Sequence, residues 1–594
     1  MHPRRRLEVP PVKAACLACR ASKARCNGQN PCNRCSVNGK VCKFIPSQRG
    51  RVVRAPVTPP STHKSSESPA SIEGPEGDGP YKRPRLSSGP RGPLHQRSGD
   101  GSTNIRIHTN GQALIDAYYL LIHPCYPVLP PPVATIADKE QAQSVQEPEF
   151  TRSPLAHAIA ALVALVPKGT CRDRIARHDY AEHCSDLALR AIDWDMDAPE
   201  PLLRNRFHHD VPVHLESTIA NFLVAVYEYN YRGSMMRART RMASVITMAM
   251  DLGLHGINID TTADSECKRR AWSMILFFAN KLSIIHHLPP LMTIGDPRFK
   301  TPPPTLSIVP EPWEAILGAQ DILLISQARP PSPKELEALD ATVSTYIQNL
   351  DRPPTGREPI DAEGLAAHNW WAVGRIVVHS ARIRLHRPSA FADIPAFVNK
   401  HCDMTALQDA KHFPIPTTNC HELPSPESLA DSPKTNEWPD AEATGPFSAR
   451  GSADICLKSA FIVLRMFRYL TEVLVDRHLQ MPGTYGASED ERRAIKASVP
   501  ITMPLMACSA MQACYVMIMT LYKVKFTLIA DQTSEDSTLK SDLSFQDTER
   551  LVEELRHGVR DSLHMLQKYG TEFAHVGPMY EELKMVHQVA FLDV

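Results

Sequence analysis

Residues 16 to 42 read "CLACRASKARCNGQNPCNRCSVNGKVC" and contain six of the fifteen cysteines of this 594-residue chain. The cysteines follow the pattern C-x2-C-x6-C twice, with five residues between the two halves. The first half is Cys16, Cys19 and Cys26, and the second is Cys32, Cys35 and Cys42. A cysteine spacing that repeats in this way indicates a repeated set of covalent or metal ligands.

Three chemistries use cysteines in such sets. A disulfide framework is typical of small secreted domains that follow a signal peptide. The N-terminal stretch "MHPRRRLEVPPVKAAC" has no apolar segment of that kind. Iron-sulfur clusters favour other spacings, such as C-x2-C-x2-C-x3-C. The pattern therefore predicts zinc bound by thiolates.

The number of cysteines bears on the number of metal ions. A tetrahedral zinc site takes four ligands. Either one zinc ion uses four cysteines and leaves two unused, or two zinc ions share the six. Two tetrahedral ions have eight coordination positions, which six thiolates fill if two of them bridge both metals. The repeat favours the first cysteine of each half, Cys16 and Cys32, as the bridging ligands.

The residues around the cysteines carry a family resemblance. "ACLACRASKARC" matches the pattern A-C-x-x-C-R-x-x-K-x-[KR]-C, and "PCNRC" matches P-C-x-x-C. Residues 12–46 thus resemble the DNA-binding domain of the fungal zinc binuclear cluster (Zn2Cys6) transcription factors. The resemblance implies two Zn²⁺ ions per chain, bridging by Cys16 and Cys32, and double-stranded DNA as the partner. It also implies CGG-type half-sites, nuclear localisation and regulation of transcription by RNA polymerase II.

The charge distribution independently favours a nucleic-acid partner. Residues 1–54 contain 13 lysines and arginines and a single acidic residue, Glu8, whereas the whole chain has a formal net charge of +1. Basic charge concentrated in one segment is typical of a surface that binds phosphates. Residues 1–11 are expected to be a basic, disordered N-terminus.

The basic side chains of this segment are the candidate DNA contacts. Each half of the cluster is expected to carry a short helix after its first cysteine, stabilised by the metal. Lys23, near the C-terminal end of the first helix, is expected to donate to guanine in the major groove, and the resemblance implies the same role. Arginines that contact phosphates position the domain without specifying sequence. The predicted DNA-binding residues are Lys23, Arg20, Arg25, Arg34, Arg49, Arg51 and Arg54.

Residues 47–110 are rich in Pro, Ser, Gly and charge, which predicts a disordered linker with basic segments. Within it, "KRPR" resembles a nuclear import signal. The four residues of this candidate signal are Lys82, Arg83, Pro84 and Arg85. The linker has no heptad pattern and therefore does not predict a coiled coil.

Residues 111–594 have long apolar periodicities, which predict a large all-α domain and make the chain mostly α. An acidic, Pro-rich stretch over residues 397–450 is expected to be a disordered insertion. The predicted helices are 112–124, 154–166, 172–194, 213–253, 265–288, 312–327, 334–350, 364–387, 453–478, 490–529 and 546–590, and we expect the longest of them to be broken.

Several stretches of residues 111–530 resemble the fungal-specific transcription factor regulatory domain. They include "LIDAYYLLIHPCYPVLP" (Leu114 to Pro130), "MAMDLGLHG" followed by "SECKRRAWSMILFFANKLSIIHHLPPLM", and "RLHRPSAF" (Arg384 to Phe391). The resemblance implies that the helical domain regulates the activity of the cluster. Its candidate partners are the transcription machinery and a second copy of the chain, which would form a homodimer through this domain.

The alternative is that the helical domain is an enzyme or a small-molecule-binding receptor, with the cluster only localising it to DNA. The sequence has no G-x-G-x-x-G, P-loop, G-x-S-x-G or H-E-x-x-H motif, so we do not expect an enzyme. Histidines 123, 255, 286, 287 and 386 are expected to be structural. Trp370 and Trp371 are expected in the core rather than around an effector.

Residues 498–522 contain no charged residue and are long enough to cross a membrane. They include Pro500, Pro504 and Gln512, which favour a core helix over a membrane span. We therefore expect no membrane partner.

Overall fold

The computed structural model describes residues 16–21, 26–27, 29, 31–39, 41–43, 107–108, 110–131, 153–166, 174–197, 206–257, 263–306, 311–354, 361–392, 447–479, 504–533 and 545–591. All regular elements within these ranges are helices, so the predicted mostly-α class is confirmed. The chain divides into two compact units, Met1–Ser98 and Gly99–Val594. The predicted disordered N-terminus and most of the predicted linker lie outside the described residues, and so does most of the predicted acidic insertion.

The first unit contains two short helices, α1 (Leu17–Ala21) and α2 (Asn33–Val37). Each begins directly after the first cysteine of its half of the repeat, as predicted. A helix of five residues is too short to be stable in water by itself. The two helices therefore depend on the cysteine cluster between them for their stability.

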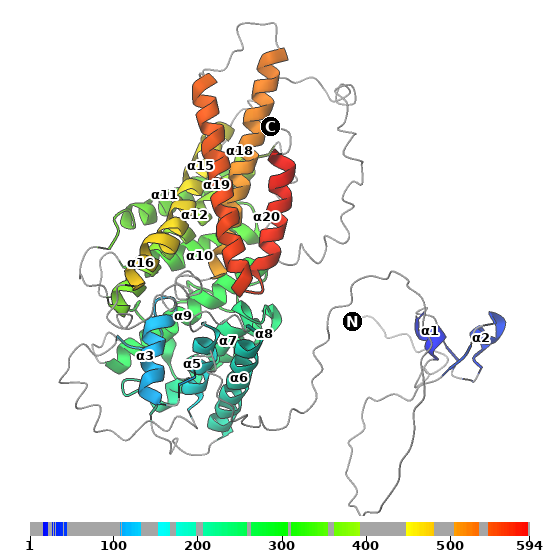
Figure 1. Cartoon of the computed structure of the whole chain (residues 1–594), viewed down its shortest axis with the longest axis vertical. Coiled ribbons are helices and arrows are strands. Elements are labelled where there is room, and N and C mark those ends of the chain that lie inside the picture. The colour runs from blue at the N-terminus through cyan, green and yellow to red at the C-terminus, as the bar shows by residue number, and fades with distance from the viewer. Residues whose placement is uncertain are drawn as a thin grey trace, which may run out of the picture. The chain divides into compact units, whose positions relative to one another are not determined.

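The second unit is built from long helices (Figure 1). They are α3 (Gly111–Leu121), α5 (Pro154–Leu165), α6 (Arg174–Asp197), α7 (Val213–Asn230), α8 (Met235–Asp251), α9 (Ala263–His286), α10 (Trp313–Ala328), α11 (Pro333–Asn349), α12 (Ala362–Ala390), α15 (Ala449–Arg468), α16 (Leu474–Leu479), α18 (Ala507–Thr533), α19 (Phe545–Glu572) and α20 (Val576–Phe591). A turn of π-helix over Tyr469–Val473 joins α15 to α16.

Two of the longest predicted helices are broken, as expected. The predicted helix 213–253 is α7 and α8, separated at Gly233, whose φ of +60° favours glycine. A Cβ atom at Gly233 would lie 3.3 Å from the Cβ of Ala574, so glycine also permits the close approach of the connection between α19 and α20. That connection divides the predicted helix 546–590 at residues 573–575.

Other predicted boundaries were wrong at helix ends. Helix α15 begins at Ala449 rather than 453, because the side chain of Ser448 accepts a hydrogen bond from the N–H of Gly451 and caps the helix. Helix α15 therefore includes the last two residues, 449 and 450, of the predicted insertion. Helix α12 continues to Ala390 although Pro388 lies in its last turn. The prediction that this helix ends at 387 was wrong, because a proline near the C-terminal end of a helix need not end it.

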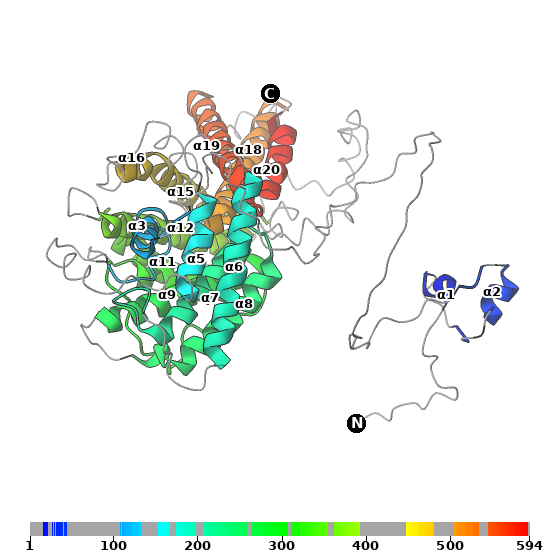
Figure 2. The ribbon, with the colours of Figure 1, turned by 60° about the horizontal axis from the view of Figure 1, so that its bottom comes forward.

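Many of the helices pack against a neighbour in the sequence, and α9 contacts α7 and α8 as well as α10. At one end of the unit, α5 packs against both α6 and α7, and α7 packs against α8; the four helices lie together in Figure 2. In the middle, α12 packs along α15 and also contacts α10, α11 and α18. At the other end α18, α19 and α20 lie side by side, as both views show.

Large aromatic side chains fill the centre of this unit. Trp272, Trp313 and Trp370 are each at most 1% exposed. The rings of Trp313 and Trp370 are stacked with centroids 4.5 Å apart, and Phe277 meets Trp370 edge to face at 4.8 Å. Trp371 is also buried. The prediction that Trp370 and Trp371 belong to the core is confirmed.

The uncharged segment near the C-terminus also belongs to the core. Pro504–Leu521 is the one described helical window long and apolar enough to cross a membrane, and 94% of it is buried inside the unit. It packs against α12 and α15 on one side and against α19 and α20 on the other. Its apolar character is therefore explained by burial among helices, although residues 498–503 of the predicted segment lie outside the described range.

A buried ionic network joins three helices. The guanidinium of Arg270 on α9 binds the carboxylate of Glu363, which is the second residue of α12, and Nη1 of Arg270 lies 3.1 Å from its Oε2. Nε2 of His123, just after α3, lies 3.0 Å from the same oxygen. Glu266 on α9 accepts from Nε of Arg270 at 2.8 Å. Two of the quoted motifs, around His123 and around Arg270, thus meet at one carboxylate.

Candidate metal centre

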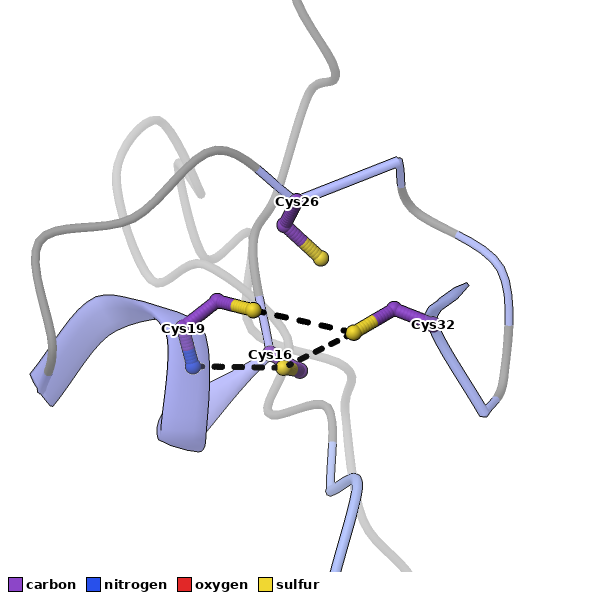
Figure 3. Close-up of side chains that lie close together, drawn as sticks. All are labelled: Cys16, Cys19, Cys26 and Cys32. Atoms are coloured by element: carbon purple, nitrogen blue, oxygen red, sulfur yellow. Dashed lines mark hydrogen bonds between the residues drawn. The ribbon is translucent and has the colours of Figure 1, made fainter. Parts of the chain in front are cut away.

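Six sulfur atoms gather in the first unit, in two groups of four. One group is Cys16, Cys19, Cys26 and Cys32, and the other is Cys16, Cys32, Cys35 and Cys42. Within each group all sulfurs lie within 4.8 Å of one another. Cys16 and Cys32 are common to both groups. Figure 3 shows the first group, with the sulfurs of all four residues directed toward one another.

The distances between the sulfurs fit metal coordination. Cys16 Sγ lies 3.8 Å from Cys32 Sγ and 3.6 Å from Cys35 Sγ, and Cys19 Sγ lies 3.6 Å from Cys32 Sγ. Four sulfurs at about 2.3 Å from a tetrahedral zinc ion are about 3.8 Å apart. A disulfide would require about 2.0 Å between sulfurs, and the six cysteines are free thiols. The donor set and its spacing therefore fit zinc.

The two shared cysteines occupy equivalent places in the two halves. Each directly precedes a helix, α1 or α2, and each sulfur accepts a hydrogen bond from one backbone N–H of that helix. The N–H of Cys19 lies 3.5 Å from Cys16 Sγ and lowers the pKa of that thiol. The corresponding N–H of Cys35 lowers the pKa of Cys32 to about 6. Lower pKa values favour the thiolate form, which is the form that binds a metal.

The other cysteines differ from these two. Burial raises the pKa of Cys19 to about 12 and also raises that of Cys35. Five of the six side chains are buried, while Cys42 is partly exposed. The Cys42 sulfur still accepts a hydrogen bond from the N–H of Cys32 at 3.2 Å. The two groups of four are therefore unequal, because the group with Cys42 is more open to solvent.

The start and the end of the motif are tied together by the backbone. The N–H of Leu17, the first residue of α1, donates to the carbonyl of Lys43 at 2.9 Å. Gly39, with φ of +59°, lies in the turn after α2. These contacts bring Cys42 back to the start of the first half, so one zinc group draws its ligands from both ends of the motif.

Most of the predicted DNA-binding residues lie outside the described part of the chain. Arg34 is an exposed residue of α2. Arg20 lies in α1, but its side chain is outside the described part. Lys23, Arg25, Arg49, Arg51 and Arg54 lie outside the described residues, as do all four residues of the candidate import signal, Lys82, Arg83, Pro84 and Arg85.

Comparison with known proteins agrees with this geometry. Residues 14–51 match the sequence model of the fungal Zn(2)-Cys(6) binuclear cluster domain. The chain is 49% identical over 41 residues to the C6 finger domain transcription factor iacK of Pestalotiopsis fici, which is 7% of this chain and 6% of that protein. It is 38% identical over 45 residues to Fluconazole resistance protein 1 of Candida albicans, which is 8% of this chain and 9% of that protein.

These matches cover a small part of each chain, so the similarity concerns the cysteine-rich segment alone. No solved structure matches the chain. Two zinc ions are the characteristic cofactor of the matched domain, and the arrangement of the six sulfurs fits them, so the predicted zinc cofactor is confirmed. Residues 14–51 of this chain are therefore a zinc-binding segment of the fungal Zn(2)-Cys(6) binuclear cluster type.

Proposed function

We propose that the chain is a nuclear, sequence-specific DNA-binding transcription factor that acts on RNA polymerase II genes. The observation that supports this most is the sharing of Cys16 and Cys32 between two groups of four sulfurs. In this proposal these two thiolates bridge both zinc ions, and the metals hold α1 and α2 in place of a hydrophobic core. The domain boundaries proposed are residues 12–46 for the cluster, 47–110 for the linker and 111–594 for the helical domain.

In the proposed complex the first half of the cluster reads a CGG-type triplet. Lys23 is the second residue after the end of α1 in the sequence, and the last carbonyls of a helix lack intrahelical partners. A lysine there would donate to guanine O6 and N7 in the major groove. Arg20, Arg25, Arg34 and the arginines after the cluster would contact phosphates and position the domain.

The assigned roles predict different effects of two substitutions. We expect Lys23→Ala to weaken binding to a CGG-type site by about 1 to 3 kcal/mol. It should also reduce the discrimination between bases within the triplet. Arg49→Ala should weaken binding to all sequences equally and reduce the slope of log affinity against log salt concentration by about one. Fluorescence anisotropy on specific and scrambled duplexes at several salt concentrations measures both quantities. Equal losses on specific and scrambled DNA for Lys23→Ala would contradict the readout role.

The linker composition predicts how two half-sites are used. A flexible chain of the 64 residues from 47 to 110 has a root-mean-square length of roughly 40 to 50 Å. If the linker is as flexible as its composition predicts, a dimer would raise the effective concentration of the second cluster near the DNA. It would not select one distance between the two triplets. We therefore expect a single triplet to be the recognised unit, or paired triplets whose spacing and orientation matter little.

A series of duplexes tests this prediction. Two CGG-type triplets are placed zero to about twenty base pairs apart in inverted, everted and direct orientation, at one fixed salt concentration. The affinity should vary less than tenfold, about 1.4 kcal/mol, across the series. If one spacing binds more than tenfold better than its neighbours, residues 43–110 fold on DNA and fix the distance between the two triplets.

We propose a regulatory rather than an enzymatic role for the helical domain, which would contact the transcription machinery or a second copy of the chain.

Ser452, His386 and Asp340 resemble a hydrolase triad, since Nδ1 of His386 lies 3.3 Å from Ser452 Oγ and Nε2 of His386 lies 3.1 Å from Asp340 Oδ1. However, these three residues are only 0%, 0% and 7% exposed. Arg382 also binds Asp340. This site is closed to a substrate and supports a structural role for His386.

A further inference from the structure

Helix α6 has an outward side that combines a large apolar side chain with acidic ones. The helix packs mainly against α5 and α7 and lies at the surface of the helical unit (Figure 2). Its buried residues include Ala181, Ala188 and Ile192, which direct one side of α6 toward these neighbours. The opposite side, called the outer face of α6 below, consists of five exposed residues, Asp186, Arg190, Asp193, Trp194 and Asp197.

Trp194 is the most unusual residue of this face. Of the five tryptophans that the structure describes, the other four are at most 4% exposed, whereas Trp194 is 76% exposed. The spacing of the outer face, with residues at i, i+4, i+7, i+8 and i+11 from Asp186, places Trp194 on the same side of the helix as the acidic residues. Tryptophan buries a large area on binding and is enriched among the residues that dominate protein interfaces.

The acidic residues of α6 fall into two groups. Glu182 pairs with Arg232, and Asp195 accepts a hydrogen bond from the hydroxyl of Ser217, so these two carboxylates hold α6 against its neighbours. The three aspartates of the outer face have no ion-pair or hydrogen-bond partner within the described part of the chain. Against the single guanidinium of Arg190, these three carboxylates leave a net charge of −2 on the outer face. This charge is therefore available to a basic partner.

The sequence around Trp194 has the same character. Residues 192–197 read "IDWDMD", in which acidic and large apolar residues alternate. Such alternation is typical of segments that activate transcription. We propose that the outer face of α6 binds a component of the transcription machinery that presents an apolar groove with a basic rim. The proposal rests on the proposed function as a transcription factor, and it specifies the contact surface and the chemistry of the partner.

Charge and apolar area together favour this partner. The groove would bury the indole of Trp194, and lysines or arginines on its rim would pair with the three aspartates, which accelerates association and selects against acidic proteins. The basic residues 1–54 of the chain itself would match the charge alone. The core described in the first unit consists of cysteines, so it offers no apolar pocket for an indole.

A reporter gene tests this proposal. The full-length chain is fused to an unrelated DNA-binding domain that brings it to the reporter, so that its own DNA recognition is not required. We expect the unaltered chain to change transcription of the reporter. Trp194→Ala should reduce that change by about threefold or more, because loss of a dominant interface tryptophan weakens binding by about 30-fold.

Further variants separate the apolar and the charged parts of the contact. Replacing the three aspartates of the outer face by asparagine should also reduce the change in reporter transcription, and Trp194→Phe should retain part of it. Met236→Ala and Asp251→Asn are the matched controls, because both residues are exposed on α8, away from the outer face of α6. Neither control should alter reporter transcription.

The reporter results distinguish two failures. If the unaltered chain leaves the reporter unchanged, the regulatory role of the helical domain is wrong, and the role of α6 with it. If the unaltered chain changes the reporter and Trp194→Ala changes it equally, only the role of α6 is wrong. The abundance and circular dichroism of Trp194→Ala should equal those of the unaltered chain, because the side chain is exposed.

Two measurements on the purified chain test other occupants of the outer face. The affinity of Trp194→Ala for DNA and its sedimentation velocity should both equal those of the unaltered chain. Tighter DNA binding by Trp194→Ala would show that the face binds the basic residues 1–54 instead. Loss of a dimer would show that it binds a second copy of the chain. Either result would overturn the proposal.

Discussion

Cys16→Ser is expected to remove both cluster zinc ions from the chain and to unfold the first unit. Cys16 belongs to both groups of four sulfurs, so its loss leaves each metal with three protein ligands. Helices α1 and α2 have five residues each and cannot persist without the metals. Structural zinc contributes about 10 to 16 kcal/mol of folding free energy in zinc-finger peptides. Sequence-specific DNA binding should therefore disappear.

Cys42→Ser is the matched control for this substitution. Cys42 belongs to one group of four and is the most exposed of the six cysteines. Native mass spectrometry of the full-length chain should show that Cys16→Ser carries two zinc ions fewer than the unaltered protein, whereas Cys42→Ser loses at most one. A Cys16→Ser protein that keeps a zinc ion in its cluster would contradict the shared role of this sulfur.

Glu363→Ala should destabilise the helical unit by about 3 to 5 kcal/mol, the range found when one partner of a buried ion pair is removed. The substitution would leave Arg270, which is 1% exposed, with Glu266 as its remaining carboxylate partner among the contacts described. It would also remove the carboxylate that meets Nε2 of His123. The midpoint of urea unfolding, followed by tryptophan fluorescence, measures the loss.

Asp561→Ala serves as the control, because Asp561 pairs with Arg468 on the surface, where both side chains are about half exposed or more. An exposed pair contributes at most about 1 kcal/mol. Comparable losses for Glu363→Ala and Asp561→Ala would show that the buried network does not stabilise the fold.

The Glu363 network also predicts a dependence on pH. Burial alone would raise the pKa of the Glu363 carboxyl, but the hydrogen bond from His123 and the charge of Arg270 outweigh it and lower the pKa from 4.5 to about 2. A lowered pKa in the folded state stabilises the protein above the unfolded value and loses that contribution as pH falls. Stability should therefore decrease between about pH 4.5 and 2, and this part of the decrease should be absent in Glu363→Ala.

The metal centre was far easier to predict from the sequence than the helical unit. All six cysteines lie within 27 residues, and their spacing is itself the geometric constraint. The contacts of Arg270 with Glu363 and of His123 with Glu363 join residues 93 and 240 positions apart. Local periodicity predicts that α9 and α12 exist, but it does not predict which of their charged residues meet. These partners depend on the packing of whole helices.

The same limit applies to His208. Its Nε2 lies 2.9 Å from the hydroxyl of Tyr119, which is 89 residues away in the sequence. Helix breaks were predictable where the length of a predicted helix required one. The positions of caps such as Ser448 were missed because the apolar pattern begins several residues after the cap.

The buried helix α18 has a consequence for how the protein is made. As the chain leaves the ribosome, α12 and α15 are complete before α18 appears, but α19 and α20 are still to be translated. During this interval the uncharged window Pro504–Leu521, which is of membrane-span length, lacks its contacts with α19 and α20. Transiently exposed apolar surface favours aggregation and chaperone binding. The window becomes fully enclosed only when α19 and α20 have emerged and packed against it, so we expect a chain truncated before Phe545 to be poorly soluble.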